Sequence, residues 1–224
     1  MYKSRHMILL ILLAAITTTL KAQDNELALR LQMGHNAVFG GFAAASVETV
    51  QTFECDFMLN AGAQYNTIGK TSIEARPGYF HDFSWGRLSA ETLLAYTGIS
   101  SVNSIAAGAG MGLSGKWLSG RLGYYYRMYG GGAGWIKEAF NVYYELNADL
   151  LQKIDDWNLR LTITNCEIFE LERHFQPSFI ALCNHYPQEH IGISFGVGCK
   201  PAGMFNMSAD HYQSFLNAGA CYRW

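Results

Sequence analysis

Strict alternation of two kinds of side chain is the feature that most restricts how this chain folds. In the last nine residues, apolar positions alternate with small or polar ones: Leu216, Ala218, Ala220, Tyr222 and Trp224 against Asn217, Gly219, Cys221 and Arg223. A period of two describes a β-strand, because successive side chains point to opposite faces, and an amphipathic helix does not produce it. One face suits lipid and the other a polar interior.

The same alternation recurs along the chain and predicts further strands. We expect them at residues 26–34, 51–65, 70–79, 85–96, 104–114, 117–128, 135–150, 157–164, 171–184 and 190–199, with a short strand at 204–209 before the last one. Segment 36–47 is apolar without clean alternation, and three interpretations stay open: a loop, a continuation of the first strand, or a segment folded into a barrel mouth. The count is twelve strands, with ten as the alternative.

The aromatic residue at the end of the last strand resembles the closing strand of bacterial outer-membrane β-barrels. In that class the last strand typically ends in Phe or Trp and is recognised by the assembly machinery, so Tyr222 and Trp224 are the expected assembly signal. The resemblance implies an all-β, transmembrane, antiparallel up-and-down β-barrel in the outer membrane of a Gram-negative bacterium. Its expected partners are outer-membrane lipid, the barrel assembly machinery and other outer-membrane proteins. A closed barrel also leaves no backbone group unpaired in lipid.

The N-terminus has the features of a signal peptide. Residues 1–6 carry Lys3 and Arg5, an apolar core follows from residue 7, and cleavage is expected after Ala22. No other apolar run reaches the ~20 residues that a membrane helix needs. We therefore expect residues 1–22 to be a signal peptide and residues 23–224 to be the barrel.

Composition argues against several classes of function. The chain has a formal net charge of −2 and no basic patch that indicates nucleic acid. Its five cysteines are odd in number, and no disulfide framework is expected. The spacing of Cys and His residues does not fit a zinc site, and no cofactor is expected.

The inward positions of the predicted strands carry both signs of charge. The expected interior charge network is Arg30, Glu54, Asp56, Glu74, Arg76, Arg87, Glu91, Arg121, Arg127, Glu145, Asp149, Arg160 and Arg223. A selective pore usually biases its lining toward one sign. Burying unpaired charges is prohibitive, so this nearly neutral set predicts ion pairs that brace the wall.

The inward faces of two predicted strands consist mainly of glycine, at residues 104–114 and 190–199. Side chains this small leave room inside the wall for water, for a solute path, or for segment 36–47 acting as a plug. Barrels of ~8 strands fill with side chains and larger ones leave a lumen. Whether a twelve-stranded barrel conducts stays open at this point.

Several histidines fall near the predicted extracellular rim. His81, His190 and His211 each have an acidic neighbour, and imidazole with carboxylate is a common metal-ligand set. The same residues are candidate bases for a serine, as in outer-membrane acyl hydrolases. No spacing defines a catalytic triad, so the identity of any metal is left open.

The leading hypothesis is a non-enzymatic outer-membrane barrel that serves as a scaffold or accessory subunit of an outer-membrane complex. The alternative is a small passive channel for small solutes. A third hypothesis is a lipid hydrolase, or a barrel that binds a ligand or metal at its rim.

Overall fold

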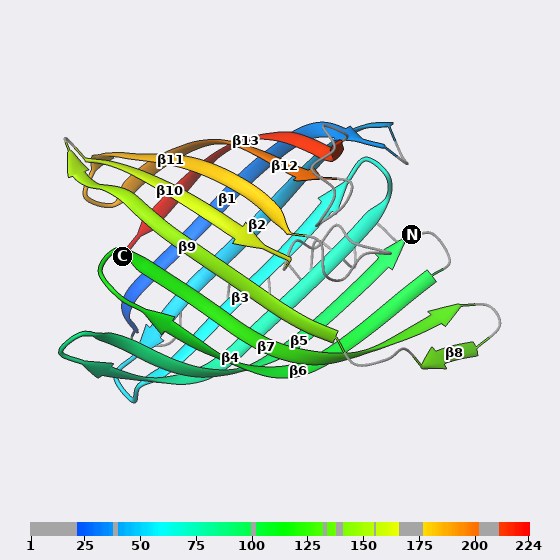
Figure 1. Cartoon of the computed structure of the whole chain (residues 1–224), viewed down its shortest axis with the longest axis horizontal. Helices are drawn as coiled ribbons and strands as arrows, with labels where there is room; N and C mark the ends of the chain where they lie inside the picture. Colours follow the sequence, from blue (N-terminus) through cyan, green and yellow to red (C-terminus); the bar gives the residue numbers. More distant parts are fainter. Residues whose placement is uncertain are drawn as a thin grey trace.

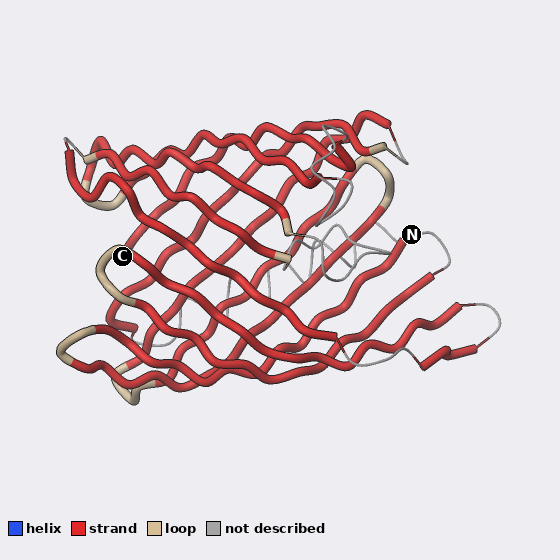
Figure 2. Tube along the Cα trace, viewed as in Figure 1, coloured by secondary structure: helices blue, strands red, loops and turns tan. Residues whose placement is uncertain are grey.

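A computed structural model describes residues 22–37, 40–99, 102–131, 134–137, 141–154, 156–165, 177–201 and 211–224. These residues form one antiparallel β-sheet that closes on itself (Figures 1 and 2). Within the described ranges, no helix is long and apolar enough to cross a membrane. Residues 1–21 lie outside them, so the signal peptide stays a prediction.

The strands follow one another around the barrel in chain order. They are β1 (Ala22–Asn36), β2 (Gly40–Phe53), β3 (Phe57–Asn66), β4 (Lys70–Phe83), β5 (Gly86–Ile99), β6 (Val102–Ser114), β7 (Leu118–Gly131), β8 (Gly134–Lys137), β9 (Asn141–Ile154), β10 (Trp157–Thr164), β11 (Ser178–Gln188), β12 (Ile191–Pro201) and β13 (His211–Arg223). In the described part of the sheet, β8 pairs with β7 alone and lies outside the ring, while β7 pairs with β9. The ring therefore has twelve strands, which confirms the predicted barrel and its strand count.

The barrel closes between its first and last strands. β1 and β13 pair in continuous register from Glu26 opposite Arg223 to Asn36 opposite Gln213. Beyond this register, the backbone N–H of Asn25 donates to the carbonyl of Trp224 over 3.3 Å. The seam is paired along its whole length, so the ring has no open edge, as a strand structure in lipid requires.

The apolar segment 36–47 is neither a loop nor a plug. Most of it belongs to β2, which pairs with β1 on one side and with β3 on the other. The predicted strand 51–65 is also wrong, because residues 54–56 form a turn that separates β2 from β3. Asp56 adopts a left-handed conformation there with φ 57°, which Asp tolerates better than most residues. The alternation of apolar and polar residues continues by coincidence across this turn, so the sequence pattern did not reveal the turn.

Two other segment assignments change. The predicted short strand 204–209 lies outside the described residues, and in the described sheet β12 pairs directly with β13. The predicted strand 135–150 comprises β8 and most of β9. β2 therefore takes the place of the short strand in the total of twelve.

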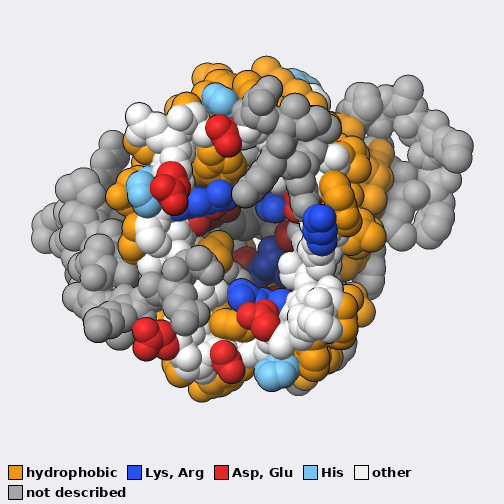
Figure 3. All heavy atoms as spheres, turned by 90° about the vertical axis from the view of Figure 1, so that its left-hand side faces the viewer, with side chains coloured by type: hydrophobic (Ala, Val, Ile, Leu, Met, Phe, Trp, Pro, Cys, Tyr) orange, Lys and Arg blue, Asp and Glu red, His pale blue; other side chains and the backbone are white. Residues whose placement is uncertain are grey.

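The outer surface of the ring is apolar, as a surface facing lipid must be. Large apolar side chains at alternate positions are well exposed on the outside; they include Leu29, Leu31, Met33, Leu94, Met111, Leu122, Phe195, Val197 and Leu216. Figure 3 shows hydrophobic side chains around the periphery of the molecule. Aromatic pairs such as the stacked rings of Phe83 and Trp85 lie near the strand ends, where interfacial girdles occur.

The two ends of the barrel differ. Turns at residues 54–56, 84–85, 115–117 and 189–190, and the turn residue Asp156, lie at the same end as the C-terminus, on the left of Figure 1. Outer-membrane barrels have short periplasmic turns, so we name this the periplasmic end and the opposite one the outer end. At the outer end β8 and the end of β7 form a hairpin that extends past the ring (Figure 1).

Candidate lumen and its charged lining

The interior of the ring contains a cavity of about 640 Å³. Small and polar side chains from most strands line it, and Figure 3 shows charged side chains around a hollow at the periplasmic end. The charged residues among the described lining are five arginines and five glutamates: Arg30, Arg76, Arg87, Arg121, Arg160, Glu26, Glu48, Glu74, Glu91 and Glu145.

Most of these charges form ion pairs between neighbouring strands. On β7 and β9, Arg121 and Glu145 are directly opposite in register and lie 2.8 Å apart. On β9 and β10, the Arg160 guanidinium donates to both oxygens of Asp149 over 2.8 and 3.2 Å. Charge-assisted pairs with this geometry stabilise adjacent strands and hold each long side chain against the wall.

Similar pairs occur at other positions around the ring. Arg30 on β1 contacts Glu48 on β2 at 2.5 Å, and Arg76 contacts Glu74 on its own strand at 2.5 Å. The Arg76 side chain is 4% exposed, and its guanidinium lies 5.4 Å from the centre of the Tyr143 ring. Pairing of buried charges removes most of the penalty of taking them out of water.

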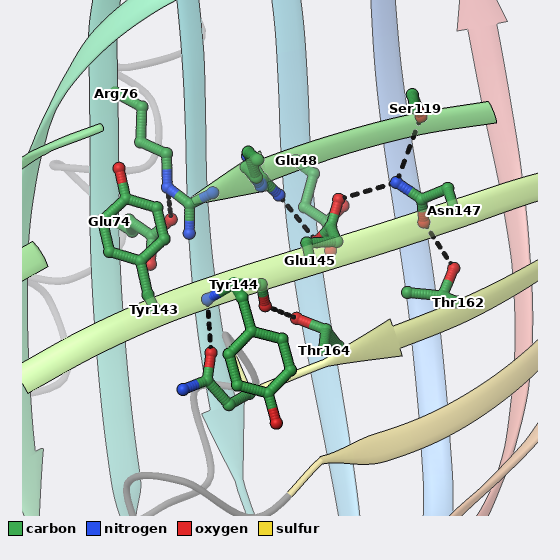
Figure 4. Close-up of polar contacts among 12 residues, drawn as sticks. Glu48, Glu74, Arg76, Ser119, Tyr143, Tyr144, Glu145, Asn147, Thr162 and Thr164 are labelled. Atoms are coloured by element: carbon green, nitrogen blue, oxygen red, sulfur yellow. Dashed lines mark hydrogen bonds and ion pairs between the residues drawn. The ribbon is translucent and has the colours of Figure 1, made fainter. Parts of the chain in front are cut away.

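A chain of polar contacts links β7, β9 and β10 (Figure 4). The Asn147 amide donates to Glu145 over 3.0 Å and to Ser119 over 3.4 Å, and its carbonyl accepts from Thr162 over 2.6 Å. Together with Arg121, these side chains connect three strands across one wall of the lumen. Such a connected network restricts the side chains that border the cavity.

The periplasmic end has its own charged contacts. Arg223 on β13 donates to Glu26 on β1 over 2.8 Å, and its guanidinium lies 3.9 Å from the Tyr186 ring centre. Arg87 donates to both oxygens of Asp82 over 2.6 and 2.9 Å. The first contact couples the two strands that close the barrel.

Most, but not all, of the charged residues predicted to face the interior do so in the structure. Glu54 and Asp56 do not face the lumen: both are exposed in the turn between β2 and β3. The remaining members lie on the inward faces of their strands: Arg30, Glu74, Arg76, Arg87, Glu91, Arg121, Arg127, Glu145, Asp149, Arg160 and Arg223. Sequence reasoning missed Glu26, although it begins the first predicted strand on the polar face, and it missed Glu48 because β2 was not assigned.

Several glycines of the two glycine faces are sockets for aromatic rings, so these positions do not leave open space. Glu91, Gly110, Gly123 and Tyr143 are in register across β5, β6, β7 and β9. The Tyr143 ring lies flat over both glycines, where any Cβ would collide with it. Its hydroxyl donates to Glu91 over 3.0 Å. On β12, Gly198 receives the ring of Phe215 in the same way.

The predicted histidine cluster at one rim is wrong. His81 and His190 lie at the periplasmic end, whereas His211 begins β13 at the outer end, opposite Pro201. The missed strand β2 explains the error. One additional strand before residue 81 moves every later connection, up to the one at residue 190, to the opposite end of the barrel. Among the described residues, no group of three His, Cys, Asp or Glu side chains is placed to hold a metal.

The described cysteines make no disulfide. Cys55, Cys183, Cys199 and Cys221 are free thiols. Cys55 lies exposed in the turn between β2 and β3.

Comparison with solved structures identifies the fold. The KdgM porin in complex with disordered oligogalacturonate superposes with a TM-score of 0.57 at 12% identity, covering 88% of this chain and 98% of that one. The translocator domain of the autotransporter NalP from Neisseria meningitidis gives 0.54 at 12% identity, covering 99% and 97%, and the NanC porin gives 0.54 at 8%, covering 88% and 98%. No protein-family model matches the chain, and no curated protein matches it. The chain has the fold of bacterial outer-membrane β-barrels.

Proposed function

We propose that this barrel is a passive channel for small hydrophilic solutes across the outer membrane. The observation that carries the proposal is the cavity of about 640 Å³, because ten charged and several polar side chains line it and most of these charges are held in pairs against the wall. Most of segment 36–47, for which a plug was one of the open interpretations, is part of the wall, as β2. A lumen with these properties favours water and small polar solutes over apolar ones.

The porin-like neighbours support this proposal over the scaffold that the sequence favoured. Two of the similar folds are named porins, and one of these is a complex with a disordered oligosaccharide. At 8–12% identity the likeness concerns the fold, so the argument for transport rests on the lumen. The charge network is compatible with either role, since it braces the wall without filling the interior.

Planar-bilayer conductance of the refolded barrel tests the proposal. Ser89 lines the cavity and its neighbour Ala90 is exposed on the lipid face, so the two positions form a matched pair. We expect stable single-channel steps from the unmodified protein, a large loss of conductance in Ser89→Trp, and little change in Ala90→Trp. A barrel that inserts but gives no steps would contradict the channel.

The accessory role remains a second candidate with its own test. If the barrel is an accessory subunit, a stable partner co-purifies when the outer membrane is solubilised gently, and the isolated barrel is silent in bilayers. Recognition of Tyr222 and Trp224 by the assembly machinery is a separate proposal. We expect removal of both residues to lower the amount of folded barrel in the outer membrane without changing the conductance of correctly inserted molecules.

A further inference from the structure

Uncharged amide side chains gather on one wall of the lumen. Gln32 on β1 and Asn217 on β13 are directly opposite each other across the closing seam, and Asn60 and Gln64 face inward on β3. All four line the cavity, and all are half-buried. We call this set, Gln32, Asn60, Gln64 and Asn217, the amide patch.

The amide groups of the patch are not used to hold the wall together. Within the described ranges, none of the four amides forms a side-chain hydrogen bond, and neither does the hydroxyl of Ser46, which is in register with Gln64. Each amide presents an acceptor oxygen and two donor hydrogens. The patch therefore offers donors and acceptors together to a solute in the lumen.

The wall that faces the patch carries the ion pairs and the polar network. In the twelve-stranded ring, β2 and β9 are six strand steps apart in either direction, so β13, β1, β2 and β3 face β6, β7, β9 and β10. On that wall Asn147 is bonded to Glu145, Ser119 and Thr162, and Arg121 is paired with Glu145. These groups are engaged with one another, whereas the amides of the patch are available to a solute.

Small side chains separate the amides and give a solute room. Ala44 on β2 is opposite Gln32, and Gly62 lies between Asn60 and Gln64 on β3; both line the cavity. Two strand spacings of ~4.8 Å separate β1 from β3, so the strands that carry Gln32 and Gln64 lie about 10 Å apart. A disaccharide covers this span with several of its hydroxyl groups.

We infer that the amide patch binds neutral, hydroxyl-rich solutes such as small saccharides and polyols. This inference rests on the proposed channel function and names the class of its solutes. A hydroxyl both donates and accepts, as an amide does, so solute and wall satisfy each other. A charged solute gains less, because the amides carry no compensating charge and the charged lining is balanced, with five arginines and five glutamates. Hydrogen bonds between neutral groups are individually modest, which suits a site that a solute must also leave.

Transient block of the single-channel current by lactose measures this binding. The frequency and duration of the interruptions give a dissociation constant, and lactobionate, an anion of similar size, gives the charge preference. We expect lactose to bind more tightly than lactobionate. Each lost hydrogen bond weakens binding by about twofold to tenfold, so the double variant Gln32→Leu and Asn217→Leu should bind lactose roughly fourfold more weakly or worse.

Asn184→Leu is the matched control, because Asn184 faces inward on β11 but lies outside the cavity lining. It replaces an amide in the same way and should change the dissociation constant of lactose by less than about twofold. Gel mobility without heating verifies that each variant is folded, and the single variants replace the double if it is not. Equal lactose binding by the double variant and the unmodified barrel, or tighter binding of lactobionate than of lactose, overturns the inference and leaves the channel intact.

Saturation-transfer NMR of lactose with the barrel in a detergent that has no sugar headgroup separates this inference from the channel proposal, because it detects binding without conduction. A silent barrel that binds lactose through the amide patch overturns the channel and supports the patch. Absence of both conductance and patch-dependent lactose binding overturns both.

Discussion

Replacing Gly110 with alanine tests the assignment of the glycine faces as sockets. The new methyl group would collide with the Tyr143 hydroxyl and would also lie 2.9 Å from the carbonyl oxygen of Leu122. Overpacking of this kind costs about 1–3 kcal/mol. If the ring moves away, the hydrogen bond from Tyr143 to the Glu91 carboxylate is lost as well, at about 1.5–3 kcal/mol for a charged acceptor. We expect Gly110→Ala to destabilise the barrel by about 2–5 kcal/mol.

Urea-induced unfolding in phospholipid vesicles, followed by tryptophan fluorescence, measures this free energy. Gly41→Ala is the matched control, because a Cβ at that position meets no atom within 4 Å, and its cost should stay within about 0.5 kcal/mol. A double-mutant cycle adds the decisive comparison. In a Tyr143→Ala background the cost of Gly110→Ala should be clearly smaller, since the ring is gone and only the contact with the Leu122 carbonyl oxygen remains. An equal cost in both backgrounds would refute the socket.

Three further outcomes are expected in the same unfolding assay. Leu31→Arg places a charge on the lipid face and should cost about 2–4 kcal/mol of unfolding free energy. Gln32→Arg faces the lumen and should cost much less. Similar costs for the two variants would contradict the assigned faces of β1. Phe215→Ala should cost about 3–5 kcal/mol, because its buried ring fills the socket over Gly198. Arg121→Met should lower the free energy of unfolding more than Arg121→Met combined with Glu145→Leu, because the single change leaves a carboxylate without its cation. An equal or larger loss of stability in the double variant would count against the ion pair.

The general architecture could be predicted because it depends on alternation. One lipid-facing and one polar face impose a period of two on each strand, and segments such as 157–164 match the observed strand residue for residue. The aromatic end at Trp224 also lies on the closing strand, at the seam with β1. These features are local in sequence, so one sequence was sufficient to identify them.

The errors arose where the local pattern does not carry the decisive information. A turn at Asp56 depends on a single left-handed residue, and the alternation of the flanking apolar side chains continues across it. Because the turn was missed, β2 was not predicted, and His81 and His190 were placed at the wrong end of the barrel. The partners of the glycine faces come from strands that are distant in sequence, such as Tyr143 over Gly110, so periodicity could not reveal that these faces were filled.

Closure between β1 and β13 has a consequence for biogenesis. β13, the strand that β1 needs as its neighbour, is synthesised after the other described strands, and eleven successive residue pairs join the two. Until then, the exposed edge of β1 presents peptide groups that hydrocarbon cannot solvate. Insertion must therefore follow synthesis of β13, and a product truncated before β13 is expected to be trapped on the aqueous side and degraded.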